Sequence, residues 1–290
     1  MKKKREKNIF LLYSEHIKRF VTTFAKNCKT KMKSPHDYKY LYGLIGRTLV
    51  HSFSRDYFNN KFEAEGIDAQ YINFEIDDIN QLSDIVAEFP NLNGLNVTAP
   101  YKEAVIKKLD SLDDDARIIG AVNVIRFIRD HSSGDLLELR GYNSDVVGFG
   151  KTIRELLTPQ HTHAMVLGTG GAAKAVRAAL MEQGVKVQLV SRRKSEHVLV
   201  YEEITRAMVA AHKLIVNATP VGKYPDEHHC PDFPYRFLTK DHFCYDLIYN
   251  PEETLFMKRS AEYGAATKNG LEMLLLQAFD SYEIWTQGYH

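Results

Sequence analysis

The sequence predicts an α/β fold made of two domains, each with a sheet flanked by helices. Three features lead to this prediction. From residue 40 onward, short apolar runs alternate with amphipathic stretches, which is the pattern of β-α-β units. The chain has 290 residues, enough for two domains of ordinary size. A turn-rich break at Thr158-Pro159-Gln160 separates two such α/β series.

The first series begins with an apolar run and continues in regular alternation. Strands are expected at residues 40–45, 69–74, 92–97, 120–128 and 138–141. Helices are expected at residues 54–65, 80–88 and 102–109. Pro100 ends the third strand because proline lacks a backbone N–H. The last two strands are expected to pair across the turn-rich residues 131–135.

The second series follows a long helix pattern at residues 144–157, and the break after it is a candidate hinge. Strands are expected at residues 164–167, 186–190, 213–216, 243–246 and 265–267, with a helix at 172–183. Residues 271–285 are strongly amphipathic and long enough to pack back on the first domain. The predicted domains are therefore a basic extension at 1–38, a first domain at 39–143 plus 269–290, and a second at 144–268.

Composition narrows the class of protein. A hydrophobic fraction of 44% with 26% charged residues is normal for a soluble globular protein, and the sequence lacks an apolar run long enough for a transmembrane helix. Cys28, Cys230 and Cys244 are too widely spaced to indicate a disulfide framework or a zinc site, so a reduced cytoplasm is expected. A zinc hydrolase based on His228-His229-Cys230 is disfavoured because adjacent ligands lack tetrahedral spacing.

The charge is unevenly distributed along the chain. Residues 1–40 hold 12 Lys or Arg and 3 Asp or Glu, a net charge of +9, against −8 for the remainder. A solvated, partly helical extension is the preferred interpretation of this basic arm, over a segment that touches nucleic acid or anionic lipid. A signal peptide is disfavoured because the apolar stretch at residues 9–13 is short and no small-residue cleavage site follows.

A glycine turn lies between an expected strand and an expected helix. Gly168, Gly170 and Ala173 fit the G-x-G-x-x-A fingerprint of a Rossmann-like, doubly wound dinucleotide-binding domain. Without Cβ atoms the backbone can approach a pyrophosphate, whose charge is stabilised by free amides at the helix N-terminus. The expected cofactor-binding residues of this turn are Gly168, Thr169, Gly170, Gly171 and Ala172.

The residues at the end of the next expected strand, 186–190, decide between NAD and NADP. Ser191, Arg192 and Arg193 lie where an NAD enzyme would place an acid for the ribose hydroxyl, and cationic side chains there could pair with a 2′-phosphate. NADP is therefore favoured, and the alternative is a solvated basic loop. Another strand ends in Asn217-Ala218-Thr219, which is expected to run beside the cofactor; the alternative is an ordinary turn capped by Asn217.

Polar clusters interrupt the first domain at strand ends. Two hydroxyls spaced by one residue, Ser52 and Ser54, could donate to a carboxylate. The other clusters contain Asn96, Thr98 and Lys102, then Asn123, then Asp145. Reducing a ketone requires a proton donor at the oxygen while hydride reaches the carbon. A lysine held by an aspartate could serve, which singles out Lys102 and Asp145 as candidate catalytic residues, although isolated residues of these types are more often structural.

From about residue 42 to 288 the chain resembles the shikimate dehydrogenase family. The matching stretches, in family order, are GLIGRTLVHSFS, GLNVTAPYKEAV, GAVNVI, GYNSDVVGF, LGTGGAAKAV, NATPVG, YDLIYNPEETLF and NGLEMLLLQAFDSYEIWT. The resemblance implies a soluble cytoplasmic oxidoreductase, monomeric or homodimeric and not binding nucleic acid or membrane. It would interconvert 3-dehydroshikimate and shikimate with NADP, in the biosynthesis of chorismate and aromatic amino acids.

The resemblance also implies roles for individual residues. Ser52 and Ser54 would hold the substrate carboxylate, and the ring and its hydroxyls would contact Thr98, Asn123, Asp145 and Gln277. Lys102 would exchange a proton with the C3 oxygen, paired with Asp145. Tyr249 would line the crevice near the nicotinamide, and Gly270 would help bring the C-terminal helix to the same cleft. Asn96 belongs to the same substrate cluster.

The sequence departs from the family pattern at two places. Ser144 replaces the usual threonine, and Ser191-Arg192-Arg193 replaces Asn-Arg-Thr in the phosphate loop, which bears on the choice of NADP. Two alternatives stay open. One is a paralogue that acts on quinate or a related ring, and the other is a non-catalytic binding protein with this fold.

Overall fold

The computed structural model describes residues 33–49, 53–130 and 132–287, and Tyr38–His290 form one compact unit. Residues 1–32 lie outside this description, and so do the interpretation of the basic arm and the position of Ser52. Before the unit, the described residues include one short 3-10 helix, η1 (Pro35–Asp37). Among the described helices, none is both long and apolar enough to cross a bilayer.

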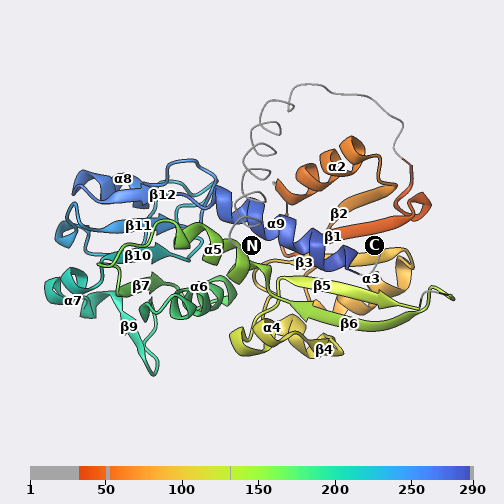
Figure 1. The fold of residues 1–290 in the computed structure, drawn as a ribbon, viewed down its shortest axis with the longest axis horizontal. Coiled ribbons are helices and arrows are strands. Elements are labelled where there is room, and N and C mark those ends of the chain that lie inside the picture. The colour runs from red at the N-terminus through yellow and green to blue at the C-terminus, as the bar shows by residue number, and fades with distance from the viewer. Residues whose placement is uncertain (1–32, 50–52, 131, 288–290) are drawn as a thin grey trace, which may run out of the picture. The chain divides into compact units, whose positions relative to one another are not determined.

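The first sheet contains six strands in the order β2-β1-β3-β5-β6-β4 (Figure 1). They are β1 (Tyr40–Gly46), β2 (Ala69–Glu75), β3 (Leu92–Val97), β4 (Ser111–Leu112), β5 (Val124–Arg129) and β6 (Leu136–Tyr142). Strands β1 to β3 are parallel, whereas β5 runs antiparallel to both β3 and β6. The predicted pairing of the last two strands across a turn is confirmed.

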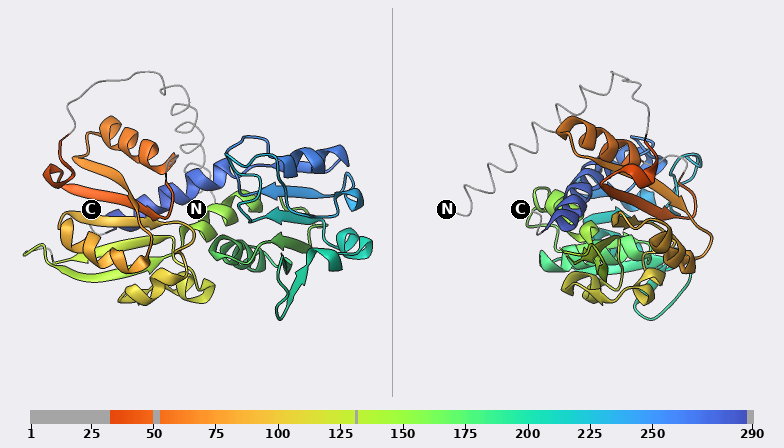
Figure 2. Two further views of the ribbon diagram at one scale, coloured as in Figure 1. Left: turned by 180° about the vertical axis from the view of Figure 1, so that it is seen from behind. Right: turned by 90° about the vertical axis from the view of Figure 1, so that its right-hand side faces the viewer.

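Short helices connect these strands. They are α2 (Phe53–Glu65), η2 (Ile79–Gln81), α3 (Leu82–Glu88), η3 (Ala104–Lys108) and α4 (Asp114–Ile119). One face of the sheet packs against α3, η3 and α4 around a core that includes Leu95, Val105 and Ile125. The opposite face is covered by α2 and the C-terminal helix, which meet through Phe58 and Trp285, with ring centroids 5.3 Å apart (Figure 2).

The second sheet is parallel throughout, with the order β12-β11-β10-β7-β8-β9. Its strands are β7 (His163–Leu167), β8 (Lys186–Ser191), β9 (Val198–Val200), β10 (Leu214–Asn217), β11 (Phe243–Asp246) and β12 (Ala266–Lys268). The helical segments are α5 (Ser144–Arg154), α6 (Gly171–Glu182), η4 (Tyr201–Glu203), α7 (Arg206–Ala211), η5 (Tyr235–Phe237) and α8 (Leu255–Glu262).

Alternate side chains of the central strands enter two separate cores. In β7, Ala164 and Val166 face the core shared with α5 and α6, while Met165 and Leu167 face the core shared with α7 and α8. Strand residues alternate between faces, so a sheet buried on both sides must be apolar at consecutive positions. This two-sided cover is the doubly wound arrangement that the sequence predicted.

The helix α9 (Leu271–Thr286) leaves the second sheet, packs along α5 and reaches β3 and β5 of the first sheet (Figure 1). Its last turn is fixed by Trp285, which is 1% exposed and donates its indole N–H to the carbonyl of Ile125 at 3.0 Å. The predicted return of the C-terminal helix to the first sheet is confirmed. The predicted domain limits at 143/144 and 268/269, which lie between the two sheets, stay a prediction.

Gly94 in β3 makes room for that tryptophan. A Cβ at this position would lie 2.3 Å from the Trp285 ring, well inside van der Waals contact. We expect Gly94→Ala to lower the free energy of unfolding by about 1–3 kcal/mol, the usual cost of overpacking, measured by denaturant titration. Gly150→Ala is the control, since its Cβ would meet only Ala179 at an ordinary 3.7 Å. Equal stability of the two variants would contradict this account of the α9 contact.

Two predicted elements were wrong in detail. Residues 102–109 form no α-helix; only Ala104–Lys108 are helical, as a 3-10 turn, because the adjacent β-branched Val105 and Ile106 favour an α-helix poorly over so short a stretch. The strand expected from residue 120 begins at Val124, since Gly120 adopts φ 69° and ends α4 instead.

The prediction also missed three short helices, α4, α7 and α8. Capping threonines precede two of them, Thr205 before α7 and Thr254 before α8.

Candidate active site

A lysine and an aspartate from separate elements meet in this fold. Lys102 lies in the loop after β3, and Asp145 lies in the first turn of α5. The Lys102 Nζ is 2.6 Å from Asp145 Oδ2, and the two side chains are only 16% and 8% exposed. The contact that a catalytic pair requires is therefore present between the residues singled out from the sequence.

The start of α5 fixes the aspartate. Asn143 is the N-cap residue: its Oδ1 accepts from the Val146 N–H at 3.3 Å, and its Nδ2 donates to the Ala121 carbonyl at 2.8 Å. The carboxylate of Asp145 thus lies at the positive end of the helix dipole, where negative charge is stabilised. Asn143 thereby ties the helix carrying Asp145 to the segment before β5.

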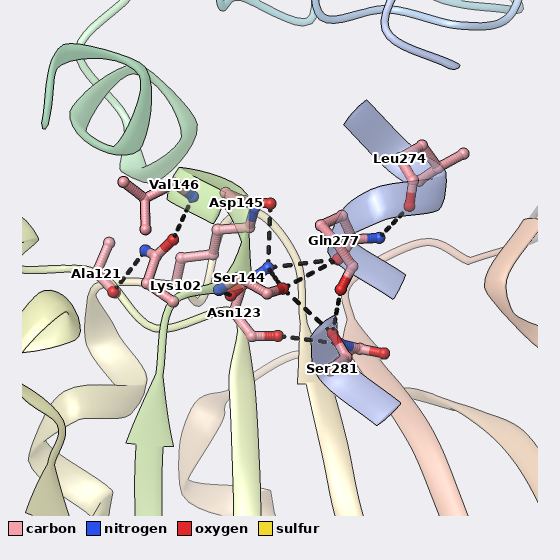
Figure 3. A network of polar contacts seen from close by, with 11 residues as sticks. Lys102, Ala121, Asn123, Ser144, Asp145, Val146, Leu274, Gln277 and Ser281 are labelled. Atoms are coloured by element: carbon pink, nitrogen blue, oxygen red, sulfur yellow. Dashed lines mark hydrogen bonds and ion pairs between the residues drawn. The ribbon is translucent and has the colours of Figure 1, made fainter. Parts of the chain in front are cut away.

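Asn123 connects the aspartate to its neighbour Ser144 (Figure 3). The buried amide donates from Nδ2 to Asp145 Oδ1 at 3.0 Å and to Ser144 Oγ at 2.9 Å. Its Oδ1 accepts from the backbone N–H of Ser144 at 2.7 Å. The polar residue found within an apolar stretch of the sequence is therefore satisfied, as a buried amide requires.

The C-terminal helix supplies a third side of the site. Gln277 of α9 faces Asn123 and Ser144, with its Oε1 3.5 Å from Asn123 Nδ2 and 3.4 Å from Ser144 Oγ (Figure 3). This approach depends on Gly148 of α5, where a Cβ would lie 2.8 Å from the Met273 carbonyl oxygen. The glycine lets the two helices pack closely enough to bring Gln277 to the predicted substrate residues.

The remaining predicted substrate residues surround this cluster less directly. Ser54 is the second residue of α2, and its side chain lowers the pKa of the Tyr71 hydroxyl against the larger effect of burial. Thr98 follows β3, and its backbone N–H donates to the Ile45 carbonyl at 2.9 Å. Tyr249 is half-buried, which raises its pKa, and its ring lies edge-on to Phe53 with centroids 6.1 Å apart. The ring contact places Tyr249 beside the start of the helix that carries Ser54.

Asn96 is held by the protein itself. Its Oδ1 accepts from the Tyr71 hydroxyl at 2.8 Å, and its Nδ2 donates to Ser281 Oγ at 3.0 Å and to the Asn123 carbonyl at 3.3 Å. Neither Tyr71 nor Ser281 was singled out from the sequence. A signal existed for Ser281, since it follows Gln277 by four residues and so shares its face of the helix.

The glycine turn adopts the geometry expected of a phosphate-binding loop. Gly168 has φ 121°, a conformation that favours glycine, and a Cβ there would lie 3.0 Å from the Ala218 carbonyl oxygen. Gly170 precedes α6, and a Cβ there would meet no atom within 4 Å. The open helix N-terminus therefore fits a pyrophosphate, with Thr169 exposed beside it and Gly171 and Ala172 in the first turn.

The first turn of α6 touches the lysine. A Cβ on Gly171 would lie 2.9 Å from Lys102 Cβ and 3.3 Å from Ala121 Cβ. Next to this contact, Lys174 of α6 forms an ion pair with Glu103 at 2.6 Å. The first turn of α6 and the aliphatic part of Lys102 are thus in direct contact, so a dinucleotide at that turn would lie next to the Lys102 side chain.

The predicted 2′-phosphate loop follows β8. Arg192 and Arg193 are exposed, and the Arg193 N–H donates to Ser191 Oγ at 3.4 Å. Residues 191–194 contain no acid, but the fold brings Glu203 of η4 into an ion pair with Lys194, which holds the pKa of Glu203 below its usual range. Lys194 is therefore charge-neutralised within the protein, and the two arginines are the cations that fit a phosphate.

The loop after β10 is organised by its own asparagine. The buried Asn217 donates to Asp246 Oδ1 at 3.0 Å and accepts from the Thr219 N–H and hydroxyl at 3.0 and 2.7 Å. Burial raises the pKa of Asp246 to about 6, against hydrogen bonds from Thr254, Ile248 and Asn217 that lower it. The side chain of Asn217 thus shapes the turn, and the contact between Gly168 and Ala218 puts that turn beside the glycine loop.

Gly270 directly precedes α9 and lies against the loop that follows β11. A Cβ there would lie 2.0 Å from the Leu247 carbonyl oxygen, so no larger residue fits without moving the backbone. The glycine places the start of α9 against the loop that follows β11. This explains why the helix carrying Gln277 begins next to the segment that contains Tyr249.

Comparison with known proteins shows which family this chain resembles in sequence. A family model described as the shikimate dehydrogenase substrate binding domain matches residues 44–125. The chain is 35% identical to the NADP(+) shikimate dehydrogenase of Desulforamulus reducens over 268 residues, which cover 84% of this chain and 89% of the relative.

Solved structures extend the comparison. The shikimate 5-dehydrogenase of Thermus thermophilus, in complex with NADP(H) and shikimate, superposes with a TM-score of 0.72 at 28% identity, covering 85% of this chain and 93% of that one. The quinate dehydrogenase of Corynebacterium glutamicum, in complex with NAD, gives 0.73 at 30% identity, with 86% and 94% covered. The chain belongs to the shikimate dehydrogenase family.

Proposed function

We propose that this protein reduces the C3 ketone of 3-dehydroshikimate to shikimate with NADPH, reversibly, in the biosynthesis of chorismate and aromatic amino acids. The observation that carries the proposal is the buried Lys102–Asp145 pair, at 2.6 Å, in contact with the first turn of the phosphate-binding helix through Gly171. The proposed proton donor and the proposed dinucleotide site thus lie next to each other, which is what a ketone reductase requires.

The proposed chemistry assigns one proton transfer to the protein. NADPH supplies a hydride to C3, and the carbonyl oxygen takes a proton from the Lys102 ammonium as negative charge develops on it. In the oxidation direction the neutral lysine accepts the hydroxyl proton. Asp145 holds the lysine in position and accepts a hydrogen bond from a substrate hydroxyl, so orientation is set before reaction.

The substrate is proposed to bind between the first sheet and α9. Ser52 and Ser54 would hold its carboxylate, while Asn123, Thr98, Gln277 and Asp145 would contact the ring hydroxyls. Tyr249 would line the side nearest the nicotinamide. The shared network around Asn123 supports this placement, because it presents Asp145 and Gln277 on the same side of the site.

The cofactor is proposed to lie along the glycine turn and the 191–193 loop. We expect Arg192→Ala to raise the KM for NADP by roughly 10- to 100-fold, the effect of losing one charge-assisted hydrogen bond, and to leave the KM for NAD nearly unchanged. Lys194→Ala is the control, because its ammonium is already paired with Glu203. Equal changes for NADP and NAD in steady-state kinetics would remove Arg192 from phosphate recognition.

The wider assignments are also proposals. We place the protein in the cytoplasm as a monomer or homodimer that binds neither nucleic acid nor membrane. Residues 39–143 plus 269–290 and residues 144–268 are proposed as the substrate and cofactor domains, which close around bound ligands near Thr158. Scattering curves that are identical with and without NADP and shikimate would count against closure.

A panel of four reactions tests the assignment: shikimate or quinate with NADP or NAD, followed by absorbance of the reduced nicotinamide. The similarity to a quinate dehydrogenase makes quinate the second candidate substrate. The highest kcat/KM is expected for shikimate with NADP. A higher value for quinate would change the substrate assignment, and inactivity in all four reactions would favour a binding protein.

A further inference from the structure

A continuous series of buried hydrogen bonds starts behind the substrate site, at Tyr71 of β2. The tyrosine is 0% exposed, and its hydroxyl donates to Asn96 Oδ1 at 2.8 Å. Burial raises its pKa well above the usual value, so the hydroxyl keeps its proton and remains a donor. The Ser54 side chain, proposed to hold the carboxylate, lowers the pKa of this hydroxyl against the larger effect of burial, so the series begins beside Ser54.

Ser281 of α9 continues the series toward the catalytic pair. It is 0% exposed, and its Oγ accepts from Asn96 Nδ2 at 3.0 Å and lies 3.2 Å from Ser144 Oγ (Figure 3). The Ser281 hydroxyl donates its hydrogen to the Gln277 carbonyl at 2.7 Å. A hydroxyl has one hydrogen, so Ser144 is the donor in the contact between the two serines, and it shares that hydrogen with Gln277 Oε1 at 3.4 Å.

The series ends on the catalytic pair. The hydroxyl of Ser144 accepts from Asn123 Nδ2 at 2.9 Å, and the same amide nitrogen donates to Asp145 Oδ1 at 3.0 Å. The other carboxylate oxygen of Asp145 holds Lys102. Every side-chain amide hydrogen of Asn96 and Asn123 is donated in this arrangement. Neither amide can therefore flip by 180° without breaking two hydrogen bonds.

We propose that Tyr71 and Ser281 are positioning residues for the reaction: through Asn96 and Ser144 they fix the amide of Asn123, which in turn orients Asp145 toward Lys102 and the substrate. Neither residue needs to touch substrate or cofactor. The inference rests on the proposed function, and it adds two residues that act on the catalytic pair from behind. It also assigns Asn96 mainly to the network and not to substrate contact.

The test uses Tyr71→Phe, Ser281→Ala and the double variant in the full-length protein. Each single variant removes one oxygen: Tyr71→Phe takes away the donor to Asn96 Oδ1, and Ser281→Ala leaves one of the two Nδ2 hydrogens of Asn96 without an acceptor. We expect kcat/KM for shikimate to fall about tenfold in each, with the KM for NADP unchanged. Because both act through Asn96, the double variant is expected to lose clearly less than the product of the two single losses.

Matched controls separate positioning from loss of stability. Tyr235→Phe removes a buried tyrosine hydroxyl that donates to the Pro231 carbonyl at 3.0 Å. Ser260→Ala removes a buried helix hydroxyl that donates to the Phe256 carbonyl at 2.8 Å, four residues back, as Ser281 does to Gln277. Both controls lie outside the network, so their free energies of unfolding are expected to fall while kcat/KM for shikimate stays near the wild-type value.

The outcomes are distinct. Three results would each overturn the positioning role. The first is a double variant whose loss in kcat/KM for shikimate equals the product of the two single losses. The second is a KM for NADP that changes as much as the kcat/KM for shikimate, and the third is a kcat/KM as low in the controls as in the network variants. A wild-type kcat/KM in both single variants would overturn it as well. Wild-type protein unable to oxidise shikimate would instead overturn the proposed function itself, and the inference with it.

Discussion

Replacement of Lys102 by alanine is expected to lower kcat for shikimate oxidation by roughly 10²- to 10⁴-fold, the usual contribution of a general acid or base. The lysine is proposed to exchange the proton of the C3 oxygen, and its ammonium is 2.6 Å from Asp145 in a largely buried pair. The remaining activity would come from orientation of hydride donor and acceptor alone. Single-turnover absorbance of the reduced nicotinamide measures the chemical step directly.

Lys174→Ala provides the control for this variant. Lys174 lies on α6 close to the same contact and is also paired at 2.6 Å, with Glu103, but the two side chains are 35% and 49% exposed. An exposed ion pair contributes little, so kcat should change by less than about fivefold. A Lys102→Ala enzyme as active as this control would remove the lysine from the mechanism.

Replacement of Asp145 by asparagine is expected to reduce kcat/KM for shikimate by roughly 10²- to 10³-fold. The substitution keeps the shape but removes the charge that holds a buried ammonium, and breaking such a pair costs about 3–5 kcal/mol. Because the carboxylate both positions Lys102 and is proposed to bind the substrate, a lower kcat and a higher KM are expected together. Steady-state kinetics with varied shikimate at saturating NADP separates the two changes.

The control for Asp145 is a partly buried aspartate of the C-terminal helix. Asp280 lies on α9, and burial raises its pKa to about 6, against a lowering by Lys151. It makes no described contact with the network around Asn123. Asp280→Asn is therefore expected to retain nearly full kcat/KM. Similar losses in the two aspartate variants would indicate a general response to a lost carboxyl group and would contradict a specific role for Asp145.

Much of the fold was predictable because its strands are apolar at consecutive positions. Strands β1, β3 and β11 begin within one residue of the predicted starts, and the glycine turn was placed between β7 and α6. Helices of six to eight residues, such as α4, α7 and α8, were missed because so few turns carry little periodicity. Their stability comes from caps and from packing that only the folded chain reveals.

The site was predictable in its residue types but not in its connections. Lys102 and Asp145 were recognisable as polar residues at strand ends, whereas their contact depends on how the loop after β3 meets α5. In the sequence Tyr71 is an ordinary tyrosine of an expected strand, and only the fold shows that its hydroxyl donates a hydrogen bond to Asn96. Glu203 forms an ion pair with Lys194 from nine residues away, so the positive charge of residues 192–194 is partly neutralised by an acid that lies outside that stretch of the sequence.

The most direct test of the central claim is the fate of the hydrogen at C3. The purified protein is incubated with NADP and shikimate carrying deuterium at C3, and the reduced cofactor is analysed by mass spectrometry. Transfer of the deuterium to the nicotinamide is the predicted result, because the proposed mode of binding places C3 beside the cofactor and its oxygen beside Lys102. Reduced cofactor without deuterium, or no reduction at all, would contradict the account.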